Sequence, residues 1–418
     1  MRNEVMTVVP DPTRDAACEV VITGAGVCSR LGDDLAATET VLRTARAVPF
    51  DVWEPAKPYE ARCRLCGLYR GPLAGTKHEV RGMGRAARMA YHAALIALDQ
   101  ARLERRDIAV LAGSGTGDVA TLSEVQAKLE ERKTTRSVSP LALPRMMAST
   151  VSANLATVLR TTGPAFGVTA ACATGGINIA VAAQLIALGH VPAALAGGAE
   201  AADSLFHAGF EAMRAYNDDG PAADPLRASR PYAADRAGFV FGEGAGIVVL
   251  ETRASATARG AEILGVVHGS GMSSNGSGDM VSPSAPGAVA AMQTALRQAG
   301  LGPDDIDYVN THGASTPAGD VVEIDALRTV FGGRPVPYSS TKGYTGHPIS
   351  AGGALEAIFT CAMLRGGWIA PSIHAEPIDA ALADYPPVIA PTARELRHAL
   401  SNSLGFGGTN VCLVLGRP

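Results

Sequence analysis

Apolar residues along the chain form short continuous runs that alternate with segments of helical spacing. The continuous runs, bounded by glycine and other turn residues, predict buried strands at residues 19–26, 108–112, 263–268, 306–310 and 336–339. Apolar positions three or four residues apart predict helices at residues 33–45, 83–101, 119–132, 149–159, 286–299, 321–330 and 354–364. Strands that alternate with helices in this way predict an α/β fold whose sheet is largely parallel and covered by helices.

The order of strands and helices in the first part of the chain is repeated in the second. The glycine-rich GFVFGEGAGIVVLE at residues 238–251 predicts two strands around a turn, and SNSLGFGGTNVCLVL predicts the final strands. No low-complexity linker separates the two parts. We therefore expect two similar halves, residues 1–252 and 253–418, that meet near residues 252–259 and share one interface.

The segment at residues 161–199 contains no Asp, Glu, Lys or Arg and is long enough to cross a bilayer, which needs about 20 apolar residues. Glycines and prolines interrupt it throughout, which favours a buried strand, helix and second strand over a membrane span. The polar start of the chain, residues 1–17, lacks the basic region and continuous apolar stretch of a signal peptide. These features predict a cytoplasmic protein without a membrane anchor.

Composition and charge narrow the range of functions. The 418 residues are 47% apolar and 18% charged, which is the balance of a packed globular protein rather than a disordered one. The net charge of −4 gives no overall field that would attract nucleic acid or an acidic membrane surface. Seven cysteines, an odd number, fit a reduced cytosolic chain better than a disulfide scaffold. Cys63 and Cys66 form a lone C-x-x-C pair without a second pair at zinc-like spacing, so we expect no metal.

One cysteine stands where a nucleophile is often placed. The sequence VTAACATGG at residues 168–176 runs from a predicted strand through a tight turn into a helix that begins just after Cys172. The positive end of a helix and its unpaired backbone N–H groups lower the pKa of a thiol in that position. The alternative is an inert thiol in an apolar core, since free cysteines are usually buried and unreactive.

Two histidines lie in glycine-rich loops that follow predicted strands. They are His312 in VNTHGASTPAGD and His347 in SSTKGYTGHPIS, with Lys342 five residues before the second. Loops at the carboxyl ends of parallel strands are where open α/β sheets hold their sites, although most histidines of a chain are structural or surface groups. A cysteine with two histidines suits acyl transfer onto sulfur, followed by hydrogen bonding to an enolate oxygen.

Together these motifs resemble those of the β-ketoacyl-[acyl-carrier-protein] synthases, the elongating condensing enzymes of type II fatty-acid and polyketide systems. The resemblance covers about residues 18–417. TAACATGG resembles the nucleophile elbow of the family, and NTHGASTPAGD and STKGYTGH resemble its two histidine loops. SRPYAADRAGFVFGEGAG resembles the glycine-rich segment before the domain switch, and SNSLGFGGTN resembles the loop that carries a gating phenylalanine, here Phe406. The resemblance implies a thiolase-like α/β fold, with two similar mixed-sheet halves in an α-β-α-β-α layered sandwich.

The resemblance also implies a two-step condensation. An acyl chain moves from an acyl carrier protein (ACP) to the cysteine; malonyl-ACP then loses CO2, and its enolate attacks the thioester to release a 3-oxoacyl-ACP. No metal or redox cofactor is implied, because phosphopantetheine arrives on the carrier. The residues implied are the catalytic set Cys172, His312, His347 and Lys342, the supporting carboxylates Glu323 and Glu356, and the backbone N–H groups of Cys172 and Phe406 as an oxyanion hole.

Several positions depart from the family pattern where the substrate is bound. Ala314 stands in place of a threonine, Ser350 in place of a glycine, and Leu404 in place of a phenylalanine. Thr116 is smaller and more polar than the residue usual there, which would admit longer or less saturated chains. This favours specialised polyketide or polyene assembly, with ordinary drift as the alternative. The acyl and pantetheine pocket positions implied are Thr116, Phe210, Thr316, Leu404, Gly405 and Gly407.

The resemblance implies a carrier-protein partner and a dimer. The apolar helix near residues 176–188 and the strand after it are expected at a two-fold interface. A homodimer is the first expectation, and a heterodimer with a ketosynthase-like subunit stays open. Two basic clusters are expected to dock the acidic carrier, with plain solvated surface as the alternative. Their residues are Lys77, Arg81, Arg85, Arg132, Lys133 and Arg136.

Three other functions are consistent with parts of the sequence. A non-catalytic chain-length factor usually lacks the nucleophile, which is present here as Cys172. A degradative thiolase carries a second cysteine near the C-terminus as a base, whereas Cys412 falls inside a predicted strand. A cysteine hydrolase would leave the TKGYTGH and GFGG loops without a role.

Overall fold

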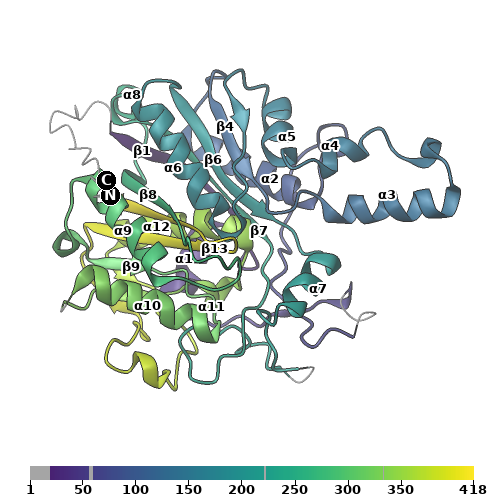
Figure 1. Ribbon diagram of the computed structural model, residues 1–418. Coiled ribbons are helices and arrows are strands. Elements are labelled where there is room, and N and C mark those ends of the chain that lie inside the picture. The colour runs from purple at the N-terminus through teal and green to yellow at the C-terminus, as the bar shows by residue number, and fades with distance from the viewer. Residues whose placement is uncertain (1–18, 56–59, 221–222, 333) are drawn as a thin grey trace, which may run out of the picture.

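A single ten-stranded sheet runs through the protein (Figure 1). The computed structural model describes residues 19–55, 60–220, 223–332 and 334–418, so the predicted polar tail at residues 1–17 lies outside the described residues. The strands of the large sheet are β1 (Val20–Cys28), β4 (Ala109–Gly113), β5 (Ala165–Phe166), β6 (Ala193–Glu200), β7 (Gly244–Thr252), β8 (Gly265–Ser274), β9 (Tyr308–Asn310), β10 (Tyr338–Ser339), β13 (His398–Gly405) and β14 (Thr409–Gly416). Two small sheets pair β2 (Asp51–Val52) with β3 (Leu65–Cys66) and β11 (Trp368–Ile369) with β12 (Thr392–Ala393).

The two sides of the sheet repeat the same arrangement of antiparallel and parallel strand pairs. From the centre outward, one side runs β1, β7, β6, β4, β5 and the other runs β8, β14, β13, β9, β10. On each side the two inner pairings are antiparallel and the two outer pairings are parallel. Only a short register, Val20–Ile22 against Gly265–Val267, joins β1 to β8. The expectation of a largely parallel sheet was therefore wrong, and the mixed sheet implied by the family resemblance is confirmed.

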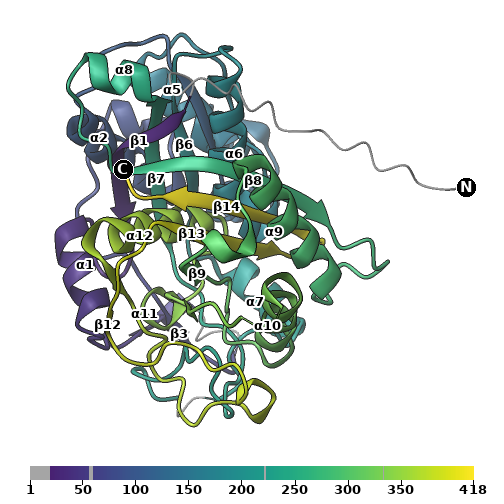
Figure 2. The same ribbon diagram turned by 90° about the vertical axis from the view of Figure 1, so that its left-hand side faces the viewer.

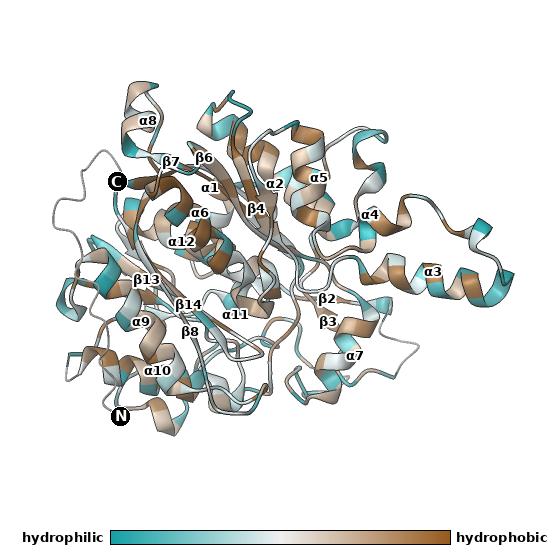
Figure 3. Cartoon of the chain, turned by 45° about the horizontal axis from the view of Figure 1, so that its top comes forward, coloured by the Kyte–Doolittle hydropathy of each residue, from teal (hydrophilic) through white to brown (hydrophobic). Residues whose placement is uncertain are grey.

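Helices form three layers around the two sides of the sheet. They are α1 (Leu35–Arg43), α2 (Arg85–Ala101), α3 (Val119–Arg132), α4 (Ala142–Met146), α5 (Thr150–Leu159), α6 (Thr174–Ala187), α7 (Ser204–Ala212), α8 (Arg253–Ala258), α9 (Ala285–Ala299), α10 (Pro317–Phe331), α11 (Lys342–Thr345) and α12 (Gly352–Gly366). Helices α6 and α12 are apolar nearly all round and lie in the middle layer, between the inner faces of both sheet sides (Figure 3). The outer layers are α2 with α5 on one side and α9 with α10 on the other.

The uncharged segment at residues 161–199 is the strand, helix and strand that its pattern predicts, namely β5, α6 and β6. No helix in the described part of the chain is long and apolar enough to cross a membrane. Strand β6 lies between β4 and β7, so its backbone is already paired on both sides. The expectation that the strand after the apolar helix pairs across a dimer was therefore wrong, because the edge strand is β5, which precedes the helix.

Two other sequence expectations differ from the structure. The segment at residues 238–251 contains one strand rather than two, because only β7 (Gly244–Thr252) is paired as a strand, whereas residues 239–242 make isolated bridges to Tyr216, His347 and Gly67. This segment is therefore fixed to loops around the site instead of to a neighbouring strand. Helix α10 begins at Pro317, four residues before the predicted start, since proline is favoured in the first turn of a helix.

Helices α3 and α4 project from the body of the molecule as an arm (Figure 1). The arm exposes the apolar side chains of Leu122, Leu129 and Leu143. In the turned view α8 lies at the top of the molecule and α10 lies below the central sheet (Figure 2). The arm thus extends beyond the layered body in which the site lies.

Candidate active site

Cys172 lies at the bottom of a pocket, in a single 3-10 turn (Ala171–Ala173) that leads into α6. Its side chain is buried. Ala171 takes a φ of +46°, which a residue with a Cβ rarely adopts, so the turn depends on the groups around it. The side chain of Asn178 on α6 supports the approach to the turn, because it accepts from Val168 N at 2.9 Å and donates to Gly197 O at 3.1 Å.

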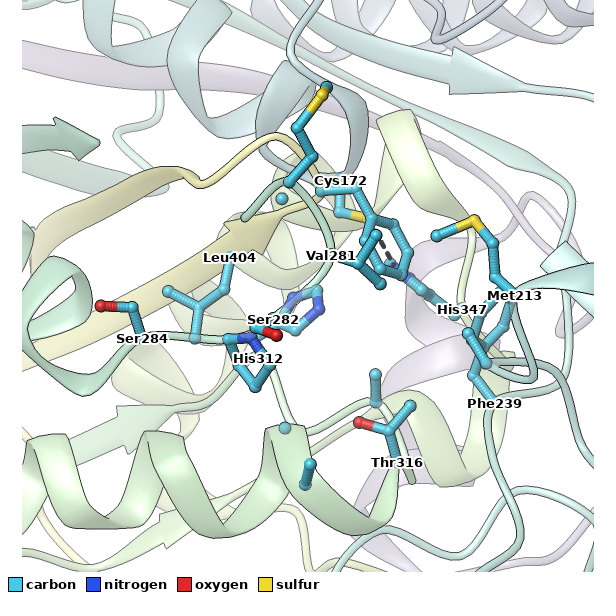
Figure 4. Close-up of a pocket in the computed structure, with 18 of the residues that line it drawn as sticks. Cys172, Met213, Phe239, Val281, Ser282, Ser284, His312, Thr316, His347 and Leu404 are labelled. Atoms are coloured by element: carbon cyan, nitrogen blue, oxygen red, sulfur yellow. Dashed lines mark hydrogen bonds between the residues drawn. The ribbon is translucent and has the colours of Figure 1, made fainter. Parts of the chain in front are cut away.

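The two predicted histidines meet at this cysteine (Figure 4). His347 Nε2 lies 3.0 Å from Cys172 Sγ, and the rings of His312 and His347 lie 5.0 Å apart in an edge-to-face arrangement. One donor atom from each of the three side chains lies within 4.8 Å of the others. The three side chains are therefore close enough to act on one bound thioester.

The loop of His312 is held by a buried polar network. Both carboxylate oxygens of Glu323 accept backbone hydrogen bonds at 2.8 Å, one from His312 N and one from Gly313 N. Lys342 Nζ donates to His312 O at 2.5 Å and forms a buried ion pair with Glu356. The structure thus brings together Lys342, Glu323 and Glu356, the network expected from the sequence.

One member of this network was missed by sequence reasoning. Asn402, in the middle of β13, donates from Nδ2 to Glu323 Oε1 at 3.2 Å. Its side chain is buried. An asparagine in the middle of a buried strand is a polar residue that needs a partner, and that was the signal available in SNSLGFGG.

Burial sets the protonation state of the site. The pKa of the Cys172 thiol is raised to about 12, chiefly because the thiol is desolvated, whereas the sequence predicted a lowered pKa. The backbone of Phe406, the charge of Lys342 and the backbone of Cys172 itself act in the opposite direction but are weaker. Burial and the charge of Lys342 also hold the pKa values of His312 and His347 well below their usual range. At neutral pH the site therefore holds a neutral thiol and two neutral imidazoles.

The pocket above Cys172 encloses about 360 Å³. Predicted residues Thr316, Leu404, Gly405 and Phe406 line it, and so does Ala314, the departure from threonine. Phe210 packs beside it, with its ring 5.8 Å from that of Phe406. The predicted pocket residue Gly407 lies outside the lining, and its backbone N–H donates to Met280 O at 2.8 Å.

Part of the mouth was not expected from the sequence. Met213 and Arg214 follow α7, and Met280, Val281 and Ser282 come from the loop before α9; all line the pocket. Met280 and Val281 are exposed, which gives the mouth an apolar rim. These residues lie in loops whose composition carries no periodic pattern, so no signal in the single sequence places them at the site.

Two departures from the family pattern lie away from the pocket lining. Thr116 is exposed, and the structure does not bring it to this pocket. Ser350 is buried behind the nucleophile turn, and its Oγ donates to Glu200, a residue that sequence reasoning missed. Cys412 is buried in the core between β14 and α9, so it is not placed to act as a second catalytic cysteine.

Five of the six predicted docking residues are exposed without a buried carboxylate partner: Lys77, Arg81, Arg132, Lys133 and Arg136. Arg85 differs from them. Its guanidinium forms an ion pair with Glu243, a buried carboxylate, and also donates to Tyr69 O at 2.8 Å. Arg85 therefore has a structural partner inside the protein, which leaves it less available to a docked protein.

Comparison with known proteins assigns the family. The family model for the beta-ketoacyl synthase N-terminal domain matches residues 17–256, and that for the C-terminal domain matches residues 264–376. The chain belongs to the beta-ketoacyl synthase family. It is 36% identical over 413 residues to 3-oxoacyl-[acyl-carrier-protein] synthase 2 of Vibrio cholerae, a match that spans 95% of this chain and 99% of that protein.

Solved structures of similar proteins support the same family assignment. A beta-ketoacyl synthase from Burkholderia phymatum superposes with a TM-score of 0.89 at 33% identity, over 96% of this chain and 99% of the other. The ishigamide ketosynthase/chain length factor superposes with a TM-score of 0.85 at 29% identity, also over 96% of this chain and 99% of the other. The predicted family, thiolase-like fold and enzyme class are thus confirmed: the protein is an acyltransferase of the condensing, decarboxylating kind.

Proposed function

We propose that this ketosynthase elongates an acyl chain carried on a free-standing ACP by one malonyl-derived unit. The observation that carries the proposal is the meeting of Cys172, His312 and His347 at the bottom of one pocket, with His347 Nε2 at 3.0 Å from the sulfur. The likeness to 3-oxoacyl-[acyl-carrier-protein] synthase 2 of Vibrio cholerae, over 95% of this chain, supports an acyl carrier protein as the partner.

The first step moves the acyl group onto Cys172. The thiol attacks the thioester carbonyl of the acyl carrier, the C–S bond to the carrier breaks, and the thiol proton passes through His347 to the departing carrier sulfur. The backbone N–H groups of Cys172 and Phe406 both lower the pKa of the thiol, and in this step they would hold the oxyanion. No net proton is gained or lost.

The second step forms the new carbon–carbon bond. Malonyl-ACP loses CO2, and the resulting enolate attacks the acyl thioester at Cys172, which leaves as a thiolate and takes up one proton. The neutral imidazoles of His312 and His347 donate hydrogen bonds to the enolate oxygen without carrying a charge of their own. Lys342, Glu323 and Glu356 hold the His312 loop in place.

The carrier arm enters past Arg214, whose cation at the pocket mouth suits the phosphate of phosphopantetheine. The exposed basic residues Lys77, Arg81, Arg132, Lys133 and Arg136 offer a surface for an acidic carrier. Phosphopantetheine supplied by the carrier is the one prosthetic group the mechanism uses, and we assign no metal. We also propose a cytoplasmic location, and a division into halves at residues 1–252 and 253–418.

Two oligomeric states are proposed for this chain. A homodimer is our first proposal, because the complete catalytic set is present in this chain. The second is the catalytic subunit of a heterodimer with a chain length factor, favoured by the likeness to the ishigamide ketosynthase/chain length factor. The polyketide and fatty-acid routes share this chemistry, and the acyl chain preferred by the enzyme distinguishes them.

Intact-protein mass spectrometry with a panel of acyl-ACPs, followed by malonyl-ACP, tests the function. The wild-type chain should gain the mass of the acyl group, and malonyl-ACP should then yield a carrier heavier by one ketide unit. Cys172→Ala should not be acylated. His312→Ala should still load, and His347→Ala should load more slowly because its imidazole carries the thiol proton. Both variants should release CO2 at least about 100-fold more slowly. Elongation by the histidine variants at the wild-type rate would contradict the mechanism.

A further inference from the structure

A buried carboxylate lies behind the nucleophile turn. Glu200 ends β6, and 1% of its surface is exposed. Its Oε2 accepts from Ser350 Oγ at 2.8 Å and from Gly115 N at 2.9 Å. A Cβ on Gly115 would lie 2.7 Å from that oxygen, so the close approach requires glycine. No cationic side chain among the described residues forms an ion pair with Glu200.

Ser350 connects this carboxylate to the nucleophile turn. Its Oγ lies 3.4 Å from Ala171 O, the carbonyl of the peptide bond that Cys172 belongs to. A hydroxyl has one proton to donate. When Glu200 is ionised, that proton is donated to the carboxylate. When Glu200 is protonated, it donates to Ser350 Oγ, and the serine proton is released to Ala171 O. The protonation state of Glu200 therefore decides which hydrogen bond supports the turn.

The charge of Glu200 also reaches the thiol. Burial raises the pKa of Glu200 to about 7. When the carboxylate is ionised, its negative charge raises the pKa of the Cys172 thiol. The elements packed against β6 carry further titratable groups, among them His347 before the Ser350 turn, Glu356 and Arg365 on α12, Glu243 next to β7 and Glu251 on it, and Arg85, Arg88, His92 and Asp99 on α2. Glu356 and Glu243 have their own cationic partners, Lys342 and Arg85, whereas Glu200 has none among the described side chains.

We propose that Glu200 and Ser350 are positioning residues for Cys172, a hydrogen-bonded relay that makes the thiol less reactive when the carboxylate is ionised. Neither residue lines the pocket, so the relay acts through the turn and through charge rather than by contact with substrate. The inference rests on Cys172 as the nucleophile of the proposed function, and on nothing about the acyl chain or carrier.

Alkylation of Cys172 by iodoacetamide measures the relay without any substrate. The rate is followed by intact mass between pH 5.5 and 9 for the wild type and Glu200→Gln, and Cys172→Ala identifies the labelled site. At pH 5.5 the two proteins should react alike, since Glu200 is then neutral. At pH 9 the glutamine variant should react roughly threefold to tenfold faster, because the charge that raises the thiol pKa is gone. The wild-type plot of log rate against pH should bend near neutral pH, and the plot for Glu200→Gln should not.

Two further variants separate the relay from a general effect on the fold. Ser350→Ala removes the donor that stabilises the ionised carboxylate, so the bend should move to higher pH. Glu251→Gln changes another buried carboxylate, at the opposite end of the β6–β7 pairing, and should reproduce the wild-type profile. Equal rates for the wild type and Glu200→Gln at every pH, or a constant ratio between them, would overturn the proposal. A normal alkylation profile without condensation would instead count against the proposed function.

Discussion

At the scale of single residues, burial has opposite consequences for the acids and bases around Cys172. It raises the pKa of the carboxyl groups of Glu356 and Glu200 to about 7 and holds those of His312 and His347 well below their usual range. The histidines are thereby kept neutral throughout the physiological pH range. A neutral imidazole donates a hydrogen bond without attracting the malonyl carboxylate, which must leave as CO2.

Lys342 and Glu356 offer a test of how the His312 loop is held. Lys342→Met should lower the free energy of unfolding by roughly 3–5 kcal/mol, because it leaves the buried Glu356 without its ion pair and His312 O without its donor. The double variant Lys342→Met/Glu356→Leu should recover much of that loss, since no buried charge is then unpaired. Urea denaturation of the wild type, both single variants and the double variant measures the coupling. Additive losses would show that the pair does not act as a unit.

At the scale of elements, the sequence predicted helices and strands best where turn-forming residues bound the apolar pattern at its ends. Helix α3 was predicted at its observed bounds, Val119–Arg132, and β1 was predicted within two residues of its ends. The strand pairings were not predictable in the same way, because antiparallel and parallel partners of a fully buried strand have the same continuous apolar pattern. This is why a largely parallel sheet was expected and a mixed one is found.

The same limit applies to the site. Cys172, His312 and His347 were predicted because each lies in a short loop motif after a strand, and the network around Lys342 followed from the family resemblance. Glu200 was missed because AGGAEAAD shows only a polar residue at a strand end. The lowered thiol pKa was wrongly predicted because the helix end is a local feature, whereas desolvation depends on what the rest of the chain places over the sulfur.

The contact between β6 and the turn that carries Ser350 can be tested with one methyl group. In Gly198→Ala the new Cβ would lie 2.1 Å from Ser350 O, so the turn after His347 must move. We expect a loss of roughly 1–3 kcal/mol in the free energy of unfolding and at least a tenfold fall in condensation rate. Gly209→Ala, on α7, meets nothing within 4 Å and is the matched control. Equal activity of the two variants would show that the contact does not position the His347 loop.

At the scale of the whole molecule, the two sides of the sheet place their chemistry at one point. Cys172 comes from the side that contains β1, and His312 and His347 come from the side that contains β8. The middle helices α6 and α12 are in contact and hold the two sides together. A site assembled in this way is lost when either side is displaced, so the apolar middle layer is as necessary to activity as the catalytic side chains.

The carrier-docking surface predicts a separation between binding and chemistry. Arg81→Glu/Lys133→Glu should raise KM for the carrier roughly tenfold and leave kcat near the wild-type value, because both side chains are exposed and neither lines the pocket. The effect should shrink as salt is added. Arg297→Glu/Arg394→Glu, two exposed changes on α9 and directly after β12, is the control with the same change in net charge. Arg85→Ser should instead lower stability, since it leaves Glu243 buried without its cation. A fall in kcat without a change in KM for the double variant would contradict docking at this surface.

The projecting arm and the sheet edge together favour a second chain. Leu122 and Leu129 are 50% and 37% exposed on α3, and Phe166 is 40% exposed on the edge strand β5. An unpaired edge and an apolar arm on one molecule are surfaces that a partner covers. Light scattering should give a dimer for the wild type, and Leu122→Glu/Leu129→Glu should shift it toward monomer at micromolar concentration. Ile389→Glu, an exposed apolar residue elsewhere, should leave the dimer intact. The alternative outcome is a wild-type monomer that loads no acyl chain until a second ketosynthase-like chain is added. That result would establish the heterodimer, in which the second chain covers the same arm.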